Sequence, residues 1–181
     1  KAHYPAAYMA AVLSADMDHT DKVVTLIDEC RRMQLTVLAP DINLGRYAFT
    51  VTDDGAIAYG LGAVKGVGEA AIEAIVEVRE AGGPFTDLFD FCRRIDPRRI
   101  NKRAAEALIR VGAFDSITDH RAALLATLPQ AWTLAEQESR AADAGQNDMF
   151  GAVEADGPAP TPPLVDCPPW SAAERLAAER E

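Results

Sequence analysis

The sequence has few of the residues that build metal sites and disulfide frameworks. It contains three cysteines, at positions 30, 92 and 167, and three scattered histidines, without any C-x-x-C pair. An odd number of widely spaced cysteines is typical of reduced thiols in a cytosol, whereas small secreted domains carry paired cysteines. We therefore expect no structural zinc site and a cytoplasmic protein.

The sequence also lacks a run of about 18 apolar residues, the length that a membrane span needs. The opening KAHYPAAYMAAVL has no small-residue cleavage site, and Pro5 followed by spaced apolar residues favours a helix start over a signal peptide. We expect no membrane partner. The chain begins with Lys1 and ends within SAAERLAAERE, a pattern typical of an interrupted helix, so we expect a segment of a longer protein.

Net positive charge is absent as well. The formal net charge is −10, which argues against a surface that binds nucleic acid by bulk charge alone. One stretch differs, because residues 93–110 hold seven basic side chains against Asp96 and Glu106. The basic stretch either contributes phosphate contacts or is an ordinary solvated helix face. Its basic residues are Arg93, Arg94, Arg98, Arg99, Lys102, Arg103 and Arg110.

Apolar residues at helical spacing dominate what is present, so the predicted fold is mainly α with one small β-hairpin. Between residues 47 and 61 the apolar residues alternate instead, and Asp54-Gly55 is a hairpin turn signal. Helices are expected to start or to be capped at Pro5, Thr20, Glu69, Thr86, Lys102, Thr118 or Asp119, Pro129 and Ser171.

A glycine-rich loop, YGLGAVKGVGEAAIEAI, precedes one of these helices. Its G-x-G-x-x-x-G spacing is one residue too long for a dinucleotide-binding turn, and Lys65 precedes a glycine where a P-loop needs Gly-Lys-Ser/Thr. The remaining candidate is a helix-hairpin-helix, in which Gly66 and Gly68 allow a tight turn and Val67 plugs into the core. Amide groups of the turn and of the next helix would then face a DNA phosphate, with Lys65 adding charge. The alternative is a loop that only links two elements.

A degenerate second copy, LIRVGAFDSITDH, follows 46 residues later. Gly112 stands in the place of Gly66, but Phe114 replaces the second glycine, so this copy either contacts phosphate or serves packing only. We predict a tandem helix-hairpin-helix. Its predicted phosphate-binding residues are Lys65, Gly66, Val67, Gly68, Arg99, Lys102, Arg103, Arg110 and Gly112.

Two large apolar residues, Met149 and Phe150, stand just before a proline-rich stretch. They either fold back onto the helix of Trp132 or bury themselves in a groove of a partner. Burial of each side chain offers roughly 1.5–3 kcal/mol, and ordering the peptide offsets much of this gain. The expected affinity for a partner is therefore about micromolar.

Several motifs occur together in a fixed order. They are DKVVTLIDECRRM, APDIN, YGLGAVKGVGEAAIEAI, FTDLFDFCRRID, EALIRVGAFD, HRAALL and GQNDMFG. In this order they resemble the alpha subunit of bacterial replicative DNA polymerase III, a C-family polymerase. The resemblance covers essentially the whole chain, although Met149 stands where that family often has Leu.

The resemblance implies a division of the chain. Its parts are the end of the fingers (1–38), a connector with the β-hairpin (39–60), a tandem helix-hairpin-helix domain (61–145), a clamp-binding peptide (146–150), a proline-rich linker (151–169) and the start of another helix (170–181). By the same resemblance Gln146, Asp148, Met149 and Phe150 would contact the sliding clamp, the beta subunit. The other implied partners are double-stranded DNA, bound without sequence preference, and further holoenzyme subunits.

The resemblance also implies a parent enzyme, a DNA-directed DNA polymerase (a nucleotidyltransferase) that uses Mg²⁺ held by palm aspartates. Asp16-x-Asp18 and Asp53-Asp54 are better interpreted as capping and turn residues than as metal ligands. We therefore assign no catalytic residue and no cofactor to this segment. Two alternatives remain, a fingers-side fragment that completes the nucleotide site and a helix-hairpin-helix DNA repair protein.

Overall fold

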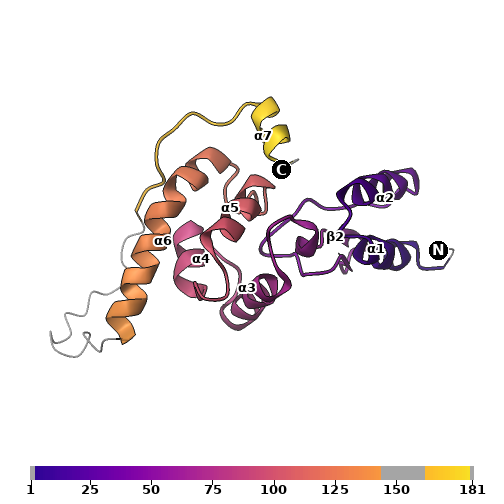
Figure 1. The fold of residues 1–181 in the computed structure, drawn as a ribbon. Coiled ribbons are helices and arrows are strands. Elements are labelled where there is room, and N and C mark those ends of the chain that lie inside the picture. Colours follow the sequence, from indigo (N-terminus) through magenta and orange to yellow (C-terminus); the bar gives the residue numbers. More distant parts are fainter. Residues whose placement is uncertain (1–2, 144–161, 180–181) are drawn as a thin grey trace.

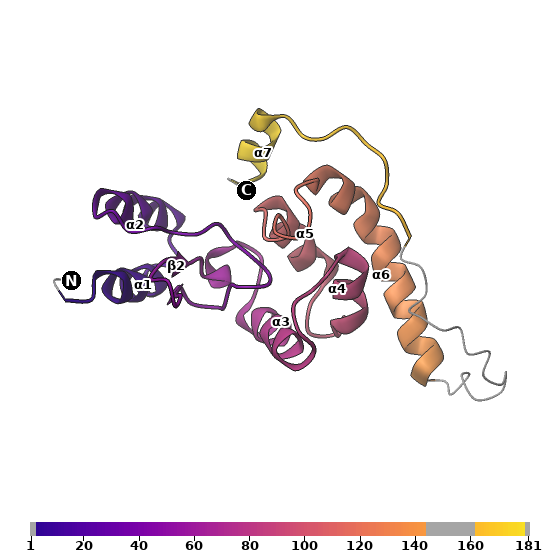
Figure 2. The ribbon, with the colours of Figure 1, turned by 180° about the vertical axis from the view of Figure 1, so that it is seen from behind.

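The computed structural model describes residues 3–143 and 162–179, and it confirms a mainly α fold with one small β-hairpin. Figures 1 and 2 show α1, α2 and the hairpin at one end, α6 at the other, and α3, α4 and α5 between them. The elements are α1 (Pro5–Ala15), α2 (Thr20–Arg32), β1 (Thr50–Val51), β2 (Ile57–Ala58), the 3-10 helix η1 (Leu61–Ala63), α3 (Glu69–Gly82), α4 (Leu88–Arg94), α5 (Lys102–Arg110), α6 (Arg121–Asp143) and α7 (Ala172–Ala178).

The first hydrophobic cluster, called the N-terminal cluster, joins α1, α2 and the hairpin. The strands pair antiparallel, with Thr50 opposite Ala58 and Val51 opposite Ile57, and the turn contains Asp54 and Gly55 as predicted. Each strand is only two residues long, shorter than the alternating pattern indicates. The buried members of the cluster are Met9, Ala10, Leu13, Val23, Cys30, Phe49 and Ile57.

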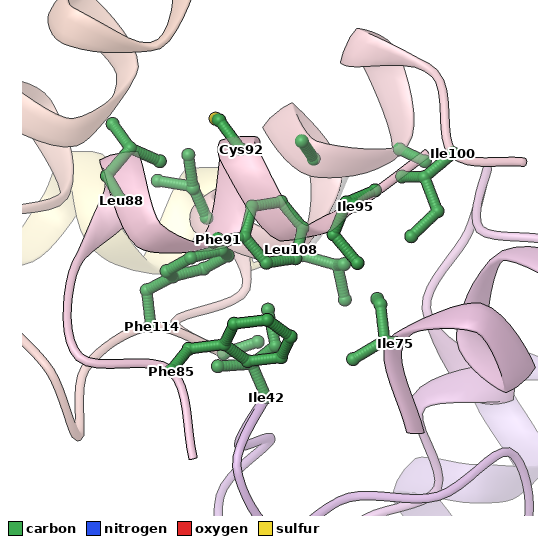
Figure 3. Close-up of a cluster of buried hydrophobic side chains, with 14 of the residues drawn as sticks. Ile42, Ile75, Phe85, Leu88, Phe91, Cys92, Ile95, Ile100, Leu108 and Phe114 are labelled. Carbon is green, nitrogen blue, oxygen red and sulfur yellow. The ribbon is translucent and has the colours of Figure 1, made fainter. Parts of the chain in front are cut away.

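The second cluster, called the central cluster, is built from α3 to α6 and contains most of the buried side chains. Phe91 of α4 lies at its middle, edge-on to Phe85 and to Phe114, with ring centroids 5.2 and 5.1 Å apart. Figure 3 shows these rings with Ile42, Ile75 and Leu108 around them. Edge-to-face pairs add to the stabilisation that burial of the rings provides.

The loop around residues 41–45 connects the two clusters. Ile42 is fully buried in the central cluster, and its amide donates to the carbonyl of Ala113 at 2.8 Å. The Asn43 side chain both donates to the Phe85 carbonyl and accepts from the Phe85 amide. Arg79 donates to the carbonyl oxygens of Ile42 and Gly45. The hydrogen bonds therefore fix this loop against three parts of the helical region.

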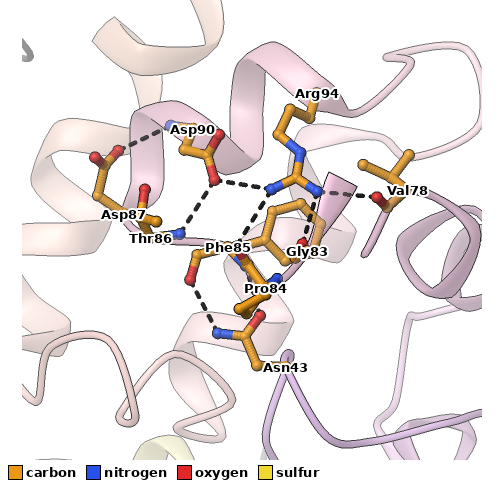
Figure 4. A network of polar contacts seen from close by, with 9 residues as sticks. All are labelled: Asn43, Val78, Gly83, Pro84, Phe85, Thr86, Asp87, Asp90 and Arg94. Atoms are coloured by element: carbon orange, nitrogen blue, oxygen red, sulfur yellow. Dashed lines mark hydrogen bonds and ion pairs between the residues drawn. The ribbon is translucent and has the colours of Figure 1, made fainter. Parts of the chain in front are cut away.

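The connection between α3 and α4 is held by Arg94 (Figure 4). Its guanidinium donates to the carbonyls of Val78 (2.9 Å) and Gly83 (2.8 Å), pairs with Asp90, and lies 4.6 Å from the centre of the Phe85 ring. These bonds satisfy carbonyls at the end of α3, where cations are favourable.

Three predicted helix N-caps are wrong. Asp87, and not Thr86, caps α4, because its carboxylate accepts from the Asp90 amide. Neither Thr118 nor Asp119 caps α6, since His120 Nδ1 accepts from the Ala123 amide. Thr20 is the first helical residue of α2 and not its cap.

Pro129 does not start a separate helix but lies inside α6, which has 23 residues. A proline within a helix removes a hydrogen bond and costs about 3 kcal/mol or more. Leu124, Leu128 and Ala131 are buried in the central cluster on both sides of Pro129, and this packing holds the helix together across it. Tertiary packing has therefore overridden a local signal.

Residues 162–179, called the C-terminal strap, return along the N-terminal half of α6 and bring α7 close to α5 (Figures 1 and 2). The strap touches α6 through the Val165 amide, which donates to Thr127 Oγ1 at 2.8 Å. Ser171 and Glu174 form a capping box, which confirms the predicted start of α7. Within the two described ranges, no helix is long and apolar enough to cross a membrane.

Candidate nucleic-acid interface

The first hairpin lies between η1 and α3. Gly66 has φ +81°, the left-handed conformation that a side chain disfavours, whereas Gly68 has φ −77° and directly precedes α3. Val67 is only 6% exposed and belongs to the central cluster, as the helix-hairpin-helix prediction requires. Its amide donates to the Val64 carbonyl at 3.3 Å, so the turn is fixed both by a hydrogen bond and by a buried side chain.

The outer side of this hairpin carries amides without protein acceptors. Within residues 3–143 and 162–179, no hydrogen-bond partner exists for the amides of Gly66, Gly68, Glu69 and Ala70. A Cβ built on Gly66 or Gly68 meets no atom within 4 Å. The first-turn amides of a helix carry a partial positive charge and favour an anion. Exposed Lys65 adds a full charge beside them.

The second hairpin repeats the turn but not its surroundings. Gly112 has φ +85°, matching Gly66 and agreeing with the prediction that the two glycines are equivalent. Here the amides of Gly112 and Ala113 are occupied, because Gly112 donates to the Ile109 carbonyl and Ala113 to the Leu108 carbonyl. Phe114, which replaces the second glycine, is fully buried against Phe91. The second hairpin is therefore packed into the central cluster.

The space outside Gly112 is filled by an ion cluster. A Cβ on Gly112 would lie 2.1 Å from Nη2 of Arg121 and 2.8 Å from Oδ2 of Asp115. Arg121 is 6% exposed, and its Nε and Nη2 donate to the two carboxylate oxygens of Asp115 at 2.9 and 2.6 Å. The hydrogen bonds that Arg121 donates to Asp115 raise the pKa of its guanidinium, burial opposes this shift, and the hydrogen bond to Glu179 adds to it. Arg121 is thus a permanent cation at the base of the second hairpin.

One cavity collects several of the predicted basic residues. It has a volume of about 450 Å³ and lies between the first hairpin, the loop at residues 39–40, α5 and the end of α7. Lys65, Arg103 and Arg110 all line it, and Arg121 joins them. Two carboxylates, those of Glu106 and Glu179, also face it. We call it the basic cavity, since its charged lining has four cations and two anions.

Two of the basic residues predicted to bind phosphate lie outside this cavity. Arg99 forms an ion pair with Glu77 of α3 at 2.5 Å, and the bond to Arg99 lowers the pKa of the Glu77 carboxyl. Lys102 is half-exposed at the start of α5 and is not part of the cavity lining. Only part of the basic stretch therefore lines the cavity, namely Arg103 and Arg110, whereas Arg99 is held in an ion pair.

Comparisons with known proteins agree with this geometry. Residues 34–124 match a family described as a helix-hairpin-helix motif, and they make up half of the chain. The chain belongs to the helix-hairpin-helix family. The family match spans both hairpins and ends just after Arg121.

The whole chain is also similar to DNA polymerase III subunit alpha, as the motif order predicts. It is 53% identical to the protein of Vibrio cholerae and 52% to that of Escherichia coli, in both cases over all of this chain and 16% of the relative. The protein of Pseudomonas aeruginosa is 54% identical over 86% of this chain and 15% of its own length. The chain thus spans about one sixth of the length of these relatives.

One residue of the helix-hairpin-helix region was missed by sequence analysis, namely Arg121. A signal existed, because Arg121 is the first residue of α6, where the helix dipole disfavours a cation. A basic residue at such a position indicates a specific anionic partner. Here the partners are Asp115 and Glu179.

The predicted clamp-binding residues Gln146, Asp148, Met149 and Phe150 lie outside the described residues. Their role stays a prediction. Asp16 ends α1 and accepts from Lys22 at 2.6 Å, and Asp54 accepts from Thr52 within the hairpin turn. Among the described residues, no three His, Cys, Asp or Glu side chains come together as metal ligands. Asp16 and Asp54 therefore occupy the cap and turn positions that the sequence indicates.

Proposed function

We propose that this chain binds the phosphate backbone of duplex DNA, without sequence preference, as one segment of a polymerase III alpha-type DNA polymerase. The observation that carries the proposal is the outer side of the first hairpin. Its amides from Gly66 to Ala70, apart from that of Val67, lack protein acceptors, and the space beside them is open. Backbone donors of this kind recognise phosphate oxygens and carry no base readout.

Side-chain cations extend this surface. Lys65 belongs both to the hairpin and to the basic cavity, and Arg103 and Arg110 line the same cavity from α5. Successive phosphates along one DNA strand can therefore contact the backbone amides of the first hairpin and then the guanidinium groups that line the basic cavity. The chain as a whole is acidic, with a formal net charge of −10, which disfavours DNA binding away from this surface. We propose that the second hairpin supports this surface by packing and that Gly112 itself makes no phosphate contact.

Duplex binding can be measured by fluorescence anisotropy with two unrelated sequences over a range of salt. We expect equal affinities for the two duplexes, with log K falling linearly with log salt. Lys65→Glu should weaken both equally and reduce the salt slope by about 1 or more. Lys22→Glu introduces the same charge change on α2, outside the cavity, and is the control. A Lys65→Glu affinity equal to that of the control would reject the hairpin as the contact.

We further propose that residues 146–150 tether the polymerase to a sliding clamp. The support is the GQNDMFG motif and the similarity to polymerase III alpha subunits. Two weak contacts, one with DNA and one with the clamp, act together because the first raises the effective concentration for the second. Processive synthesis follows from such a tether.

The clamp contact can be tested by titrating the chain with a purified bacterial sliding clamp. We expect affinity around micromolar, lost in the double variant Met149→Ala and Phe150→Ala. Val24→Ala removes an apolar side chain that is 56% exposed on α2 and serves as the control. Unchanged binding by the double variant would remove this part of the proposal.

Nucleotide incorporation by the isolated chain should be absent, since Mg²⁺-dependent transfer is proposed only for the longer parent.

A further inference from the structure

The C-terminal strap ends at the basic cavity and places a carboxylate there. Glu179 accepts from Nη1 of Arg121 at 2.8 Å, and it lines the cavity together with Lys65 and Arg103. Arg121 and Glu179 are 58 residues apart in the sequence, so this contact exists only while the strap is docked. A carboxylate bound to an arginine beside two further cations occupies the kind of place that a phosphate oxygen would take.

The contact between α7 and the rest of the molecule is thin. Ala178 is the one buried side chain of α7, whereas Leu176 is 51% exposed. The two ion pairs, Glu179 with Arg121 and Arg175 with Asp115 at 3.3 Å, involve strap side chains that are 41% and 38% exposed. Ion pairs at such exposure are screened by salt and contribute little. α7 itself is therefore held weakly.

The other end of the strap is held better. Leu164 packs against the central cluster, and the Val165 amide donates to the buried Thr127 hydroxyl. Between these anchors and α7 lie residues 166–171, which form no helix or strand. α7 can thus detach while residues 164 and 165 remain in place. The change is then limited to α7 and the connecting residues 166–171.

We propose that the C-terminal strap is a resident competitor of the duplex, in which Glu179 holds Arg121 until a backbone phosphate displaces it. This inference rests on the proposed function, because it concerns the same phosphate-binding surface. Displacement adds Arg121 Nη1 to the cations that face the duplex and removes one of the two carboxylates from the basic cavity. The strap then lowers the affinity for DNA and dissociates from the second hairpin when DNA binds.

The competition can be measured with matched charge-removing variants in the 181-residue chain. Glu179→Gln should bind duplex about three- to tenfold more tightly, because it removes a competitor that occupies the site in most molecules. Glu106→Gln removes the same charge from the same cavity, but Glu106 makes no ion pair with Arg121. We expect less than about a twofold gain from this control. Equal gains from both variants would overturn the proposal, since general electrostatics would then account for them.

Hydrogen exchange provides a second, independent measurement. On addition of duplex, amides of residues 172–179 should exchange faster, whereas those of α1 should not change. Binding of DNA with unchanged exchange in α7 would overturn the strap proposal and leave the proposed function intact. If the wild-type chain binds no DNA but the double variant Arg175→Gln and Glu179→Gln does, the competitor is supported. If neither binds, both proposals are rejected.

Discussion

The two hairpins share one backbone turn but occupy very different surroundings. Gly66 and Gly112 have almost the same positive φ, and the residue after each, Val67 or Ala113, is buried. Outside Gly66 there is open space, whereas outside Gly112 there is Arg121. The turn by itself therefore does not determine function. Its neighbours decide whether the amides face a ligand or are used within the protein.

The third residue of each turn explains much of the difference. Gly68 leaves the start of α3 uncovered, because it has no side chain and a Cβ there would meet nothing. Phe114 instead inserts beside Phe91, and the Ala113 carbonyl accepts from Ile42. The second hairpin is thus a joint between α4, α5 and the loop that leads to the N-terminal cluster. Variants at paired positions can test this division.

The largest effect is expected for Phe114→Ala. Removing a fully buried aromatic ring should lower the free energy of unfolding by about 3–5 kcal/mol, because contacts are lost and a cavity remains. Urea unfolding followed by circular dichroism measures this change. Val24→Ala, at an exposed site, should stay within about 0.5 kcal/mol. A loss below about 1 kcal/mol for Phe114→Ala would show that the second hairpin is not a structural joint.

The next largest effect on stability is expected for Gly112→Ala, and Gly66→Ala is its matched comparison. Both add a Cβ at positive φ, at a cost of about 1–2 kcal/mol. At Gly112 the Cβ also displaces Arg121 from Asp115, and the total loss of stability should reach about 2–4 kcal/mol. At Gly66 the loss of stability should stay at about 1–2 kcal/mol, the cost of the positive φ alone. Duplex binding by the folded Gly66→Ala variant should nevertheless weaken. Unfolding free energies and anisotropy measured on the same two variants separate these outcomes.

Much of this comparison could be predicted from sequence. The GVG and VGA turns predicted two equivalent glycines and a buried Val67. The β-hairpin followed from alternating apolar residues and the Asp54-Gly55 turn signal. Periodicity succeeds for the hairpin strands and helices because each of them buries one face. Glycine succeeds as a turn signal because it adopts the positive φ that other residues disfavour. The choice of Thr86 over Asp87 as a cap failed because two adjacent residues of similar capping ability cannot be separated by pattern alone.

The part that was missed depends on contacts between distant residues. The Arg121 cluster joins residues 115, 121, 175 and 179, and the strap reaches it only after returning along α6. No local periodicity encodes an ion pair across 58 residues. Pro129 failed for a related reason, because packing on both sides of it keeps α6 continuous. Local signals therefore located the first hairpin well and the environment of the second one poorly.

A third prediction concerns the ion cluster that seals the second hairpin. Asp115→Asn keeps the shape of the side chain but removes the charge that pairs with Arg121 and Arg175, so stability should fall by about 1–2 kcal/mol. Asp28→Asn breaks an exposed pair with Arg31 and should change stability by less than about 0.5 kcal/mol. Thermal or urea unfolding of the two variants compares them directly. Similar losses would mean that the cluster near Gly112 behaves as an ordinary surface pair.

The smallest effect on stability, and the sharpest test of the first hairpin, is expected for Gly68→Ala. The residue has φ −77°, and its Cβ would meet no atom, so alanine fits the folded chain and should stabilise it slightly, by about 0.4–1 kcal/mol. If a phosphate approaches this backbone closely, the added methyl group should nevertheless weaken duplex binding. Loss of affinity without loss of stability can then be assigned to the approach of the ligand. Unchanged affinity would mean that the phosphate binds elsewhere. The first hairpin would then be a structural turn, as the second hairpin is.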